Sequence, residues 1–194
     1  MSDRSNRYMP MPRAPGNHNK GYDEKREALL DRLSSALAAI DSGRASFREM
    51  AEIAGVSAPT LRHYFNDRDG VVAAYLERRG RRGEQYLAAL SRAESPFADS
   101  IRDALVFTAR GLIGGGVVDL HRIGLAEGVV SSVIGPTYLG AVLEPTLVAL
   151  ENRLGVHRDR GEMRAVDVRF AAIQLLSPLL VAVLHQNGLG GEQL

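Results

Sequence analysis

The chain has 194 residues, of which 45% are hydrophobic and 24% are charged, and its formal net charge is +1. A chain of this composition can bury one or two hydrophobic cores, and a net charge near zero gives no overall signal for nucleic acid. The absence of cysteine excludes disulfides and thiolate metal sites and suits a reducing cytosol. Basic residues predominate only in the N-terminal half: residues 1–95 carry 16 Lys and Arg against 13 Asp and Glu, and residues 96–194 carry 8 against 10.

Residues 1–22 are predicted to form a disordered basic arm outside the fold. They contain several Pro, Gly, Asn and Arg residues but hardly any aliphatic side chains, so they cannot contribute to a core. The first helix is expected after this arm, because leucines recur at helical spacing from Leu29 to Leu37 and Gly43 follows.

Residues 46–65, with the sequence SFREMAEIAGVSAPTLRHYF, are predicted to form a helix-turn-helix motif. Ser46 and Glu49 have the spacing of a capping box, which starts a helix. Gly55 supplies a turn residue without a β-carbon, and Ser57 is placed to cap a second short helix. Side chains that project from this second helix are suited to probing a DNA groove.

The sequence IAGVSAPTLRHYF, followed by NDRDGVVAAYL, resembles the DNA-binding domain of the TetR family of one-component transcriptional regulators. The resemblance is specific over residues 24–90. It implies that an aromatic-rich helix end leads into a basic residue, here Arg68, and a long fourth helix. The chain departs from the family at Arg62, where a phosphate-binding tyrosine is most common, and at Phe47, where a small hydroxyl residue is usual.

Base reading is expected to depend chiefly on Arg48, because a guanidinium can bind guanine through two hydrogen bonds. Thr60 and His63 occupy groove-facing positions, whereas Arg62, Tyr64 and Arg68 are expected to hold phosphates. The candidate DNA-binding residues are Ser46, Arg48, Ser57, Ala58, Pro59, Thr60, Arg62, His63, Tyr64 and Arg68.

A fourth helix is expected to run from Asp67 toward Ser91, with a densely charged middle over residues 77–84. Runs of charge usually face water. The arginines of this stretch are therefore interpreted as a solvated connection in preference to a second DNA contact. These arginines are Arg78, Arg79, Arg81 and Arg82.

The C-terminal half shows helical periodicity and no β signature. Pro145 is expected to kink one helix, and Pro178 lies inside another. The predicted helical stripes cover residues 101–112, 120–130, 136–155 and 166–184.

The apolar stretch Phe170–Leu184 is shorter than the ~20 residues needed to span a bilayer, so it is interpreted as a buried helix and no membrane partner is expected. Its stripe of Phe170, Ile173, Leu180 and Leu184 is more apolar than one internal face requires, which favours a homodimer through this helix. The family usually has one further helix after this point. That helix is expected to be absent or cut off after Leu194.

The resemblance implies that the C-terminal half binds an effector. Prolines and small residues tend to leave space between helices, and a few polar groups on an apolar lining are typical of ligand pockets. A largely apolar effector is therefore expected, and a cationic one only if Glu127 faces the cavity. An ion pair in the core is the favoured interpretation of Glu127, and the other candidates also have simple core interpretations. The candidate ligand residues are Phe107, Thr108, Glu127, Tyr138 and Gln174.

Enzyme and metal sites are not indicated. The five histidines have no partners at metal-ligand or catalytic-triad spacing, and no glycine-rich phosphate loop follows a strand. No cofactor is therefore expected.

The sequence predicts an all-α protein with a three-helix DNA-binding domain over residues 23–83 and a ligand-binding and dimerisation domain over residues 84–194. The function that follows is a cytoplasmic, ligand-responsive regulator that binds palindromic operator DNA as a homodimer and is released by a small apolar effector. The family resemblance favours a repressor over an activator. An all-helical module that binds DNA or a partner non-specifically, without ligand control, is the alternative. A third hypothesis is an enzyme, with an active site that the periodicity of the sequence does not reveal.

Overall fold

The computed structural model describes residues 20–38, 45–114 and 117–191, and all regular structure within these ranges is helical. The predicted all-α class is confirmed. The helices are α1 (Lys20–Ala38), α2 (Phe47–Ala54), α3 (Ala58–Phe65), α4 (Arg68–Arg82), α5 (Glu84–Leu90), α6 (Phe97–Gly114), α7 (Val117–Gly128), α8 (Ile134–Tyr138), the π-helical turn η1 (Leu139–Leu143), α9 (Glu144–Asp159), α10 (Val168–Val183) and the π-helical turn η2 (Leu184–Gly188).

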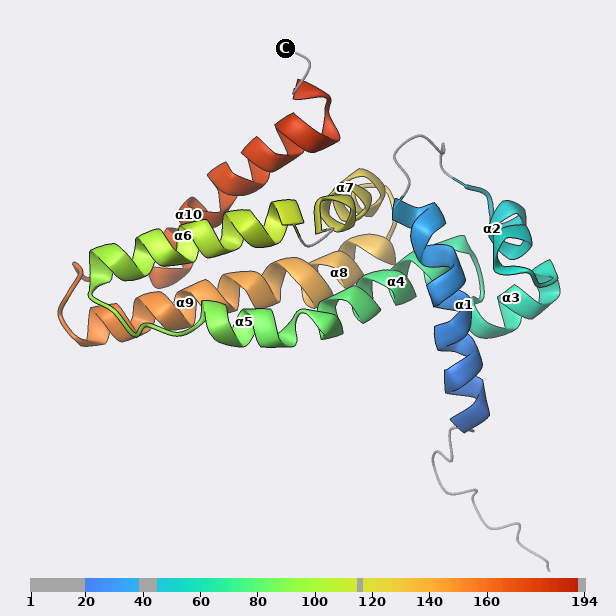
Figure 1. The fold of residues 1–194 in the computed structure, drawn as a ribbon, viewed down its shortest axis with the longest axis horizontal. Coiled ribbons are helices and arrows are strands. Elements are labelled where there is room, and N and C mark those ends of the chain that lie inside the picture. The colour runs from blue at the N-terminus through green and yellow to red at the C-terminus, as the bar shows by residue number, and fades with distance from the viewer. Residues whose placement is uncertain (1–19, 39–44, 115–116, 192–194) are drawn as a thin grey trace, which may run out of the picture.

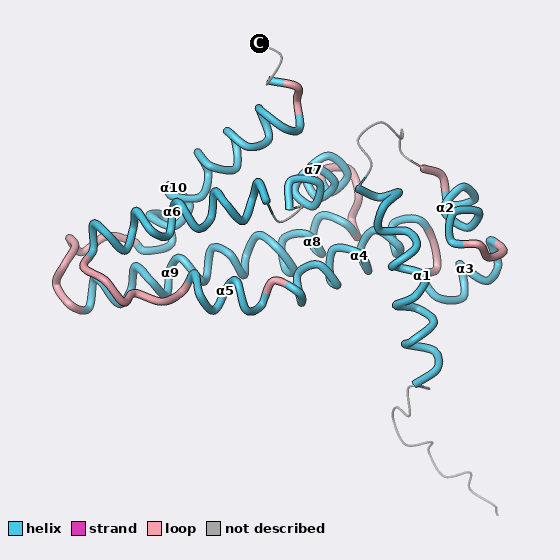
Figure 2. The backbone as a smooth tube through the Cα atoms, in the orientation of Figure 1, coloured by secondary structure: helices cyan, strands magenta, loops and turns pink. Residues whose placement is uncertain are grey.

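The molecule is elongated, with α1, α2 and α3 grouped at one end (Figure 1). Helix α4 leaves this group and runs beside α8 and η1, and α5 continues beside α9. Helix α10 packs on α9 and α6, and α6 also contacts α7. The connecting loops are short (Figure 2). One helix, α4, therefore joins the N-terminal group to the rest of the molecule.

The local signals of the helix-turn-helix act as the sequence predicts. The Ser46 hydroxyl accepts from the Glu49 amide at 3.3 Å, and the Glu49 carboxylate accepts from the Ser46 amide at 2.7 Å. Gly55 ends α2 in the left-handed region, with φ of 67°. The Ser57 side chain accepts from the amide of Thr60 at the start of α3.

Two boundaries near the N-terminal group differ from the predictions. Helix α1 begins at Lys20, so Lys20–Tyr22 belong to the fold, whereas residues 1–19, 39–44, 115–116 and 192–194 lie outside the described residues and the arm stays a prediction there. The single helix expected from Asp67 to Ser91 is divided at Gly83 into α4 and α5. Both helices pack against one continuous helical segment, α4 on α8 and η1 and α5 on α9, so their apolar periodicity does not show the division.

The kink predicted at Pro145 takes the form of the π-helical turn η1. Because proline has no amide hydrogen, the Ala141 carbonyl lacks its usual α-helical donor. The Glu144 amide reaches back five residues to the Leu139 carbonyl, which widens the helix just before the proline ring. The predicted limits of this helix were wrong. It begins at Ile134 instead of Pro136 and continues past Gly155 to Asp159.

Two hydrophobic cores fill the molecule. The first joins Leu30, Leu61 and Val72 of the N-terminal helices to Ile134 and Tyr138 of α8. The second lies between α5, α6, α9 and α10. The first core is therefore continuous from the helix-turn-helix into the C-terminal part, although the sequence predicts a domain boundary between the two.

Helix α10 is mostly exposed, so its interpretation as a buried helix was wrong. Only Ala172, Leu176 and Val183 of this helix are buried, and Phe170 is 60% exposed. With η2 it forms an apolar segment, Val168–Asn187, of 20 residues, which by length and composition alone is enough to cross a membrane. It packs on α9 and α6, so its exposed side is a candidate surface for a partner protein.

Candidate DNA-binding surface and effector pocket

The turn and the second helix of the motif present a polar face to solvent. Most of the ten candidate DNA residues lie on this face. Arg48 has an 86% exposed side chain that pairs with Glu52, one turn away. The exposed candidates are Ser46, Arg48, Ser57, Pro59, Thr60, Arg62 and His63. Ala58, Tyr64 and Arg68 are half-buried.

Two candidate phosphate-binding residues, Arg62 and Tyr64, pack against aromatic rings. The Arg62 guanidinium lies 5.4 Å from the centre of the Phe47 ring, which holds it at the surface. Tyr64 packs against Tyr22 of α1, with ring centres 4.8 Å apart, and Tyr22 also contacts the His63 ring edge to face. Phe47, which departs from the family pattern, thus supports Arg62.

Arg68 does not face the DNA-binding surface, contrary to its predicted role. Its Nε donates to the Ala45 carbonyl at 2.8 Å, and its two terminal nitrogens donate to the two carboxylate oxygens of Glu127 on α7. The Arg68 and Glu127 side chains are only 17% and 16% exposed. Beside this bridge, Ser131 donates to the carboxylate of Asp69 at 2.6 Å. Arg68 therefore fastens the start of α4 to α7 and is unavailable to a phosphate.

The arginine-rich part of α4 is not uniformly solvated. Arg78 is 4% exposed and pairs with Glu27 and Asp31 of α1, and the Arg78 guanidinium lowers the pKa of the Asp31 carboxyl. Arg81 and Arg82 stay on the surface, with side chains 55% and 60% exposed. The solvated interpretation was therefore wrong for Arg78, which holds α4 against α1.

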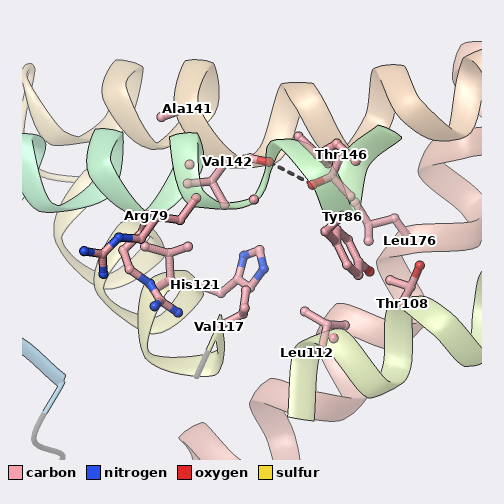
Figure 3. Close-up of a pocket in the computed structure, with 16 residues that line it drawn as sticks. Arg79, Tyr86, Thr108, Leu112, Val117, His121, Ala141, Val142, Thr146 and Leu176 are labelled. Carbon is pink, nitrogen blue, oxygen red and sulfur yellow. Dashed lines mark hydrogen bonds between the residues drawn. The ribbon is translucent and has the colours of Figure 1, made fainter. Parts of the chain in front are cut away.

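A pocket of about 300 Å³ lies between α4, α5, α6, α7, η1, α9 and α10. Its aliphatic lining includes Leu87, Leu112, Leu120, Val142 and Leu176. Arg79 lies at one end and Tyr86 and Thr108 at the other, with His121 between them (Figure 3). A small apolar cavity with a few polar groups has the composition of a ligand site.

His121 is held in the pocket as a neutral side chain. Its Nδ1 lies 2.8 Å from the Tyr138 hydroxyl, and desolvation lowers the pKa of His121 to about 4. Burial raises the pKa of Tyr138 to about 12, so both groups are uncharged near neutral pH. Gly124 permits this arrangement, because a β-carbon there would lie 2.2 Å from the Tyr138 ring.

Of the five candidate ligand residues, only Thr108 lines this pocket. Glu127 is occupied by Arg68, which agrees with its ion-pair interpretation, and Tyr138 stands behind His121. Phe107 is 38% exposed and stacks on Tyr86, and Gln174 is exposed on α10.

Sequence reasoning missed most of the polar residues that line the pocket, which are Arg79, Arg82, Tyr86, His121 and Thr146. Arg79 and His121 were judged by their neighbours in the chain. The available signal was glycine, because Gly80 and Gly111 line the cavity at close approaches between helices. A β-carbon would lie 2.2 Å from the Ala141 carbonyl oxygen at Gly80 and 2.7 Å from the Tyr86 ring at Gly111.

Comparison with known proteins gives a family for the C-terminal part and a fold for the whole chain. Residues 101–192 match the family described as AefR-like transcriptional repressor, C-terminal domain, a TetR C-terminal family. No curated protein sequence matches the chain significantly.

Solved structures with this fold come from several organisms. A TetR transcription regulator from Haloarcula marismortui is 15% identical, with a TM-score of 0.68 over 87% of this chain and 88% of that one. GusR from Salmonella enterica is 18% identical, with a TM-score of 0.66 over 82% of each chain. FadR from Bacillus subtilis, in complex with stearoyl-CoA, is 16% identical, with a TM-score of 0.61 over 84% of each chain.

These likenesses place the whole described chain in one fold, and the family match adds a sequence relationship over α6 to α10. The N-terminal group supplies the helix-turn-helix that such a regulator needs. Residues 101–192 therefore belong to a TetR C-terminal domain family, and the chain has the fold of the TetR regulators.

Proposed function

We propose that this protein is a cytoplasmic homodimeric repressor that binds a palindromic operator and leaves it when a small molecule fills the pocket. The observation that supports this most directly is the course of α4. Its first turn carries Arg68 and Asp69, which tie the helix-turn-helix to α7, and its last turns carry Arg79 and Arg82, which line the pocket. An occupant that displaces α4 would change the separation of the two reading heads.

Reading of the operator is assigned chiefly to Arg48. Arg48→Ala should relax specificity at one base pair of each half-site, with a loss of ~1–3 kcal/mol of discrimination. Selection of bound sites from random DNA, made with both proteins, measures this and should return a palindrome for the native chain.

Arg102→Ala is the matched control, since Arg102 is also an exposed arginine paired along its own helix, but on α6. Equal base preferences for the native protein and Arg48→Ala would remove Arg48 from the reading face.

The interface of the homodimer is assigned to the exposed apolar side of α10. Phe170→Glu should place a charge in that interface, convert the dimer to a monomer at micromolar concentration and weaken operator binding, because paired units read two half-sites together. Light scattering gives the mass. Val106→Glu, on the 44% exposed Val106 of α6, is the control and should stay dimeric. A native chain that is monomeric at this concentration would refute the interface.

The effector is linked to the operator by reciprocal coupling: if the effector weakens operator binding by some factor, operator DNA must weaken effector binding by the same factor. Calorimetric titrations with effector measure its affinity for the free protein and for the protein–operator complex. The stearoyl-CoA bound by the Bacillus subtilis FadR structure supports a partly apolar effector for this fold. Equal effector affinities in the two titrations would mean that the pocket is not a switch.

A non-specific DNA-binding module is the alternative function. Both functions weaken with salt, but a specific regulator keeps a preference of ~10³-fold or more for its operator over random duplex. Competition of the selected operator against random duplex at two salt concentrations therefore separates them. Members of this family generally act as transcription factors. Turnover assays would detect an enzyme, but the described residues present no candidate catalytic site for such assays to test.

A further inference from the structure

The charge of the pocket lining favours an anionic ligand. Arg79 and Arg82 line the pocket, and none of the described residues that line it is acidic. Glu127, the carboxylate that would have favoured a cation, is paired with Arg68 instead. His121 adds no charge near neutral pH, because burial keeps it neutral. A ligand with a negative head therefore meets two guanidiniums at the Arg79 end, of which Arg82 also lies 3.9 Å from the Asp31 carboxylate of α1.

The size of the pocket limits the length of the ligand. A water molecule occupies roughly 30 Å³ in the liquid. The cavity of about 300 Å³ therefore holds on the order of ten non-hydrogen atoms of similar size. Its walls are mainly aliphatic, from Leu87 and Leu112 to Leu176. A straight chain of about eight carbons with a small head group fits, whereas a chain of eighteen carbons is too long to be enclosed.

The far end of the pocket is polar. Thr108 is 3% exposed, and its hydroxyl lies next to the Tyr86 phenol. Burial raises the pKa of that phenol, and the Thr108 hydroxyl opposes the rise. Between the ends, the Nδ1 atom of His121 lies 2.8 Å from the Tyr138 hydroxyl. An oxygen on the ligand would be stabilised at the far end by accepting a hydrogen bond from the buried hydroxyl of Thr108 or Tyr86.

We propose that the effector is a medium-chain carboxylate of about ten heavy atoms, with its carboxylate at Arg79 and Arg82 and a hydroxyl or keto oxygen toward Thr108 at the far end of the chain. This proposal rests on the proposed function, because it names the effector of that pocket. It replaces the purely apolar effector expected from the sequence by one that is charged at one end and polar at the other.

Four probes of similar length test the head and the tail by calorimetry on the full chain without DNA. Octanoate should bind at least about tenfold more tightly than 1-octanol, and octylammonium should not bind, because a carboxylate pairs with the arginines. The fourth probe, 8-hydroxyoctanoate, should bind more tightly than octanoate. Stearate should bind more weakly than octanoate. An alcohol or ammonium that binds as well as octanoate would overturn the anionic assignment.

Variants locate the two ends of the ligand. Arg82→Gln should weaken octanoate by about tenfold and leave octanol unchanged, as expected for one lost charge-assisted contact. Arg81→Gln is the control, since Arg81 is exposed on the same helix and does not line the pocket. Thr108→Val should abolish the advantage of 8-hydroxyoctanoate over octanoate. Unchanged octanoate affinity in both Arg82→Gln and Arg79→Gln, with the variants folded by circular dichroism, would refute the proposal.

Operator release is measured separately by adding octanoate to the protein–operator complex. Binding of octanoate with the expected variant pattern, but without release of DNA, would uphold the ligand class and refute the switch. Release of DNA by a cation, with no binding of any carboxylate, would uphold the switch and refute the ligand class.

Discussion

Replacing either Arg68 or Glu127 by alanine is expected to lower the free energy of unfolding by about 2–3 kcal/mol, because each removes the bidentate ion-pair partner of a largely buried charge. Arg68→Ala would remove the guanidinium that binds both carboxylate oxygens of Glu127. Glu127→Ala would leave the Arg68 guanidinium with the Ala45 carbonyl and the more distant Asp69. Urea unfolding of the two single variants and the double variant measures the coupling between the side chains.

Arg48→Ala serves as the control, since its exposed pair with Glu52 should contribute less than ~0.5 kcal/mol. The operator experiment distinguishes the bridge from a phosphate contact. A residue that neutralises a phosphate changes the dependence of binding on salt by about one unit of slope, and Arg68→Ala should leave that slope unchanged. A flatter slope with unchanged stability would return Arg68 to the DNA-binding surface.

Arg153→Ala is expected to destabilise the C-terminal part by about 3 kcal/mol, because it would leave several buried acceptors without a donor. Arg153 is 8% exposed, and its Nε donates to the Leu90 carbonyl at 2.7 Å. Its Nη1 donates to the Ser100 carbonyl and hydroxyl, at 2.9 and 2.8 Å. The Ser100 hydroxyl also lies 2.8 Å from Nε2 of the fully buried His157. One side chain therefore joins α9 to α5 and α6.

Arg158→Ala on the same helix is the comparison, since Arg158 is 43% exposed and pairs only with the adjacent Asp159 among the described residues. Thermal unfolding should separate the two variants by several degrees. If both variants unfold at the same temperature, the hydrogen bonds of Arg153 contribute no more stability than hydrogen bonds from water to the same acceptors.

The helix-turn-helix could be predicted because its determinants are local. Ser46 and Glu49 are three residues apart, and the left-handed turn needs only Gly55. The same holds for the Ser57 cap and for the polar face that contains Arg48. Each of these features is encoded within one turn of helix, so the sequence shows it without knowledge of the fold.

The contacts that could not be predicted join residues far apart in the chain. Arg68 and Glu127 are separated by 59 positions, so no periodicity relates them, although each was noted singly. Arg78 was assigned to solvent because its neighbours are charged, but α1 crosses α4 at that position and supplies Glu27 and Asp31. The pocket is likewise formed by six helices and the turn η1, and the role of His121 is identified only once Tyr138 is known to lie beside it.

The wide turn η1 also fixes the register of everything that follows it. A π-helical turn holds one residue more than an α-helix of the same path, so deleting one residue from Leu139–Leu143 would let the helix close to regular α geometry. Each residue turns an α-helix by about 100°, and α9 would rotate by that angle relative to α8. Arg153 would then point away from Ser100 and Leu90. In an alignment of relatives, a one-residue gap at this turn should therefore coincide with the loss of Arg153.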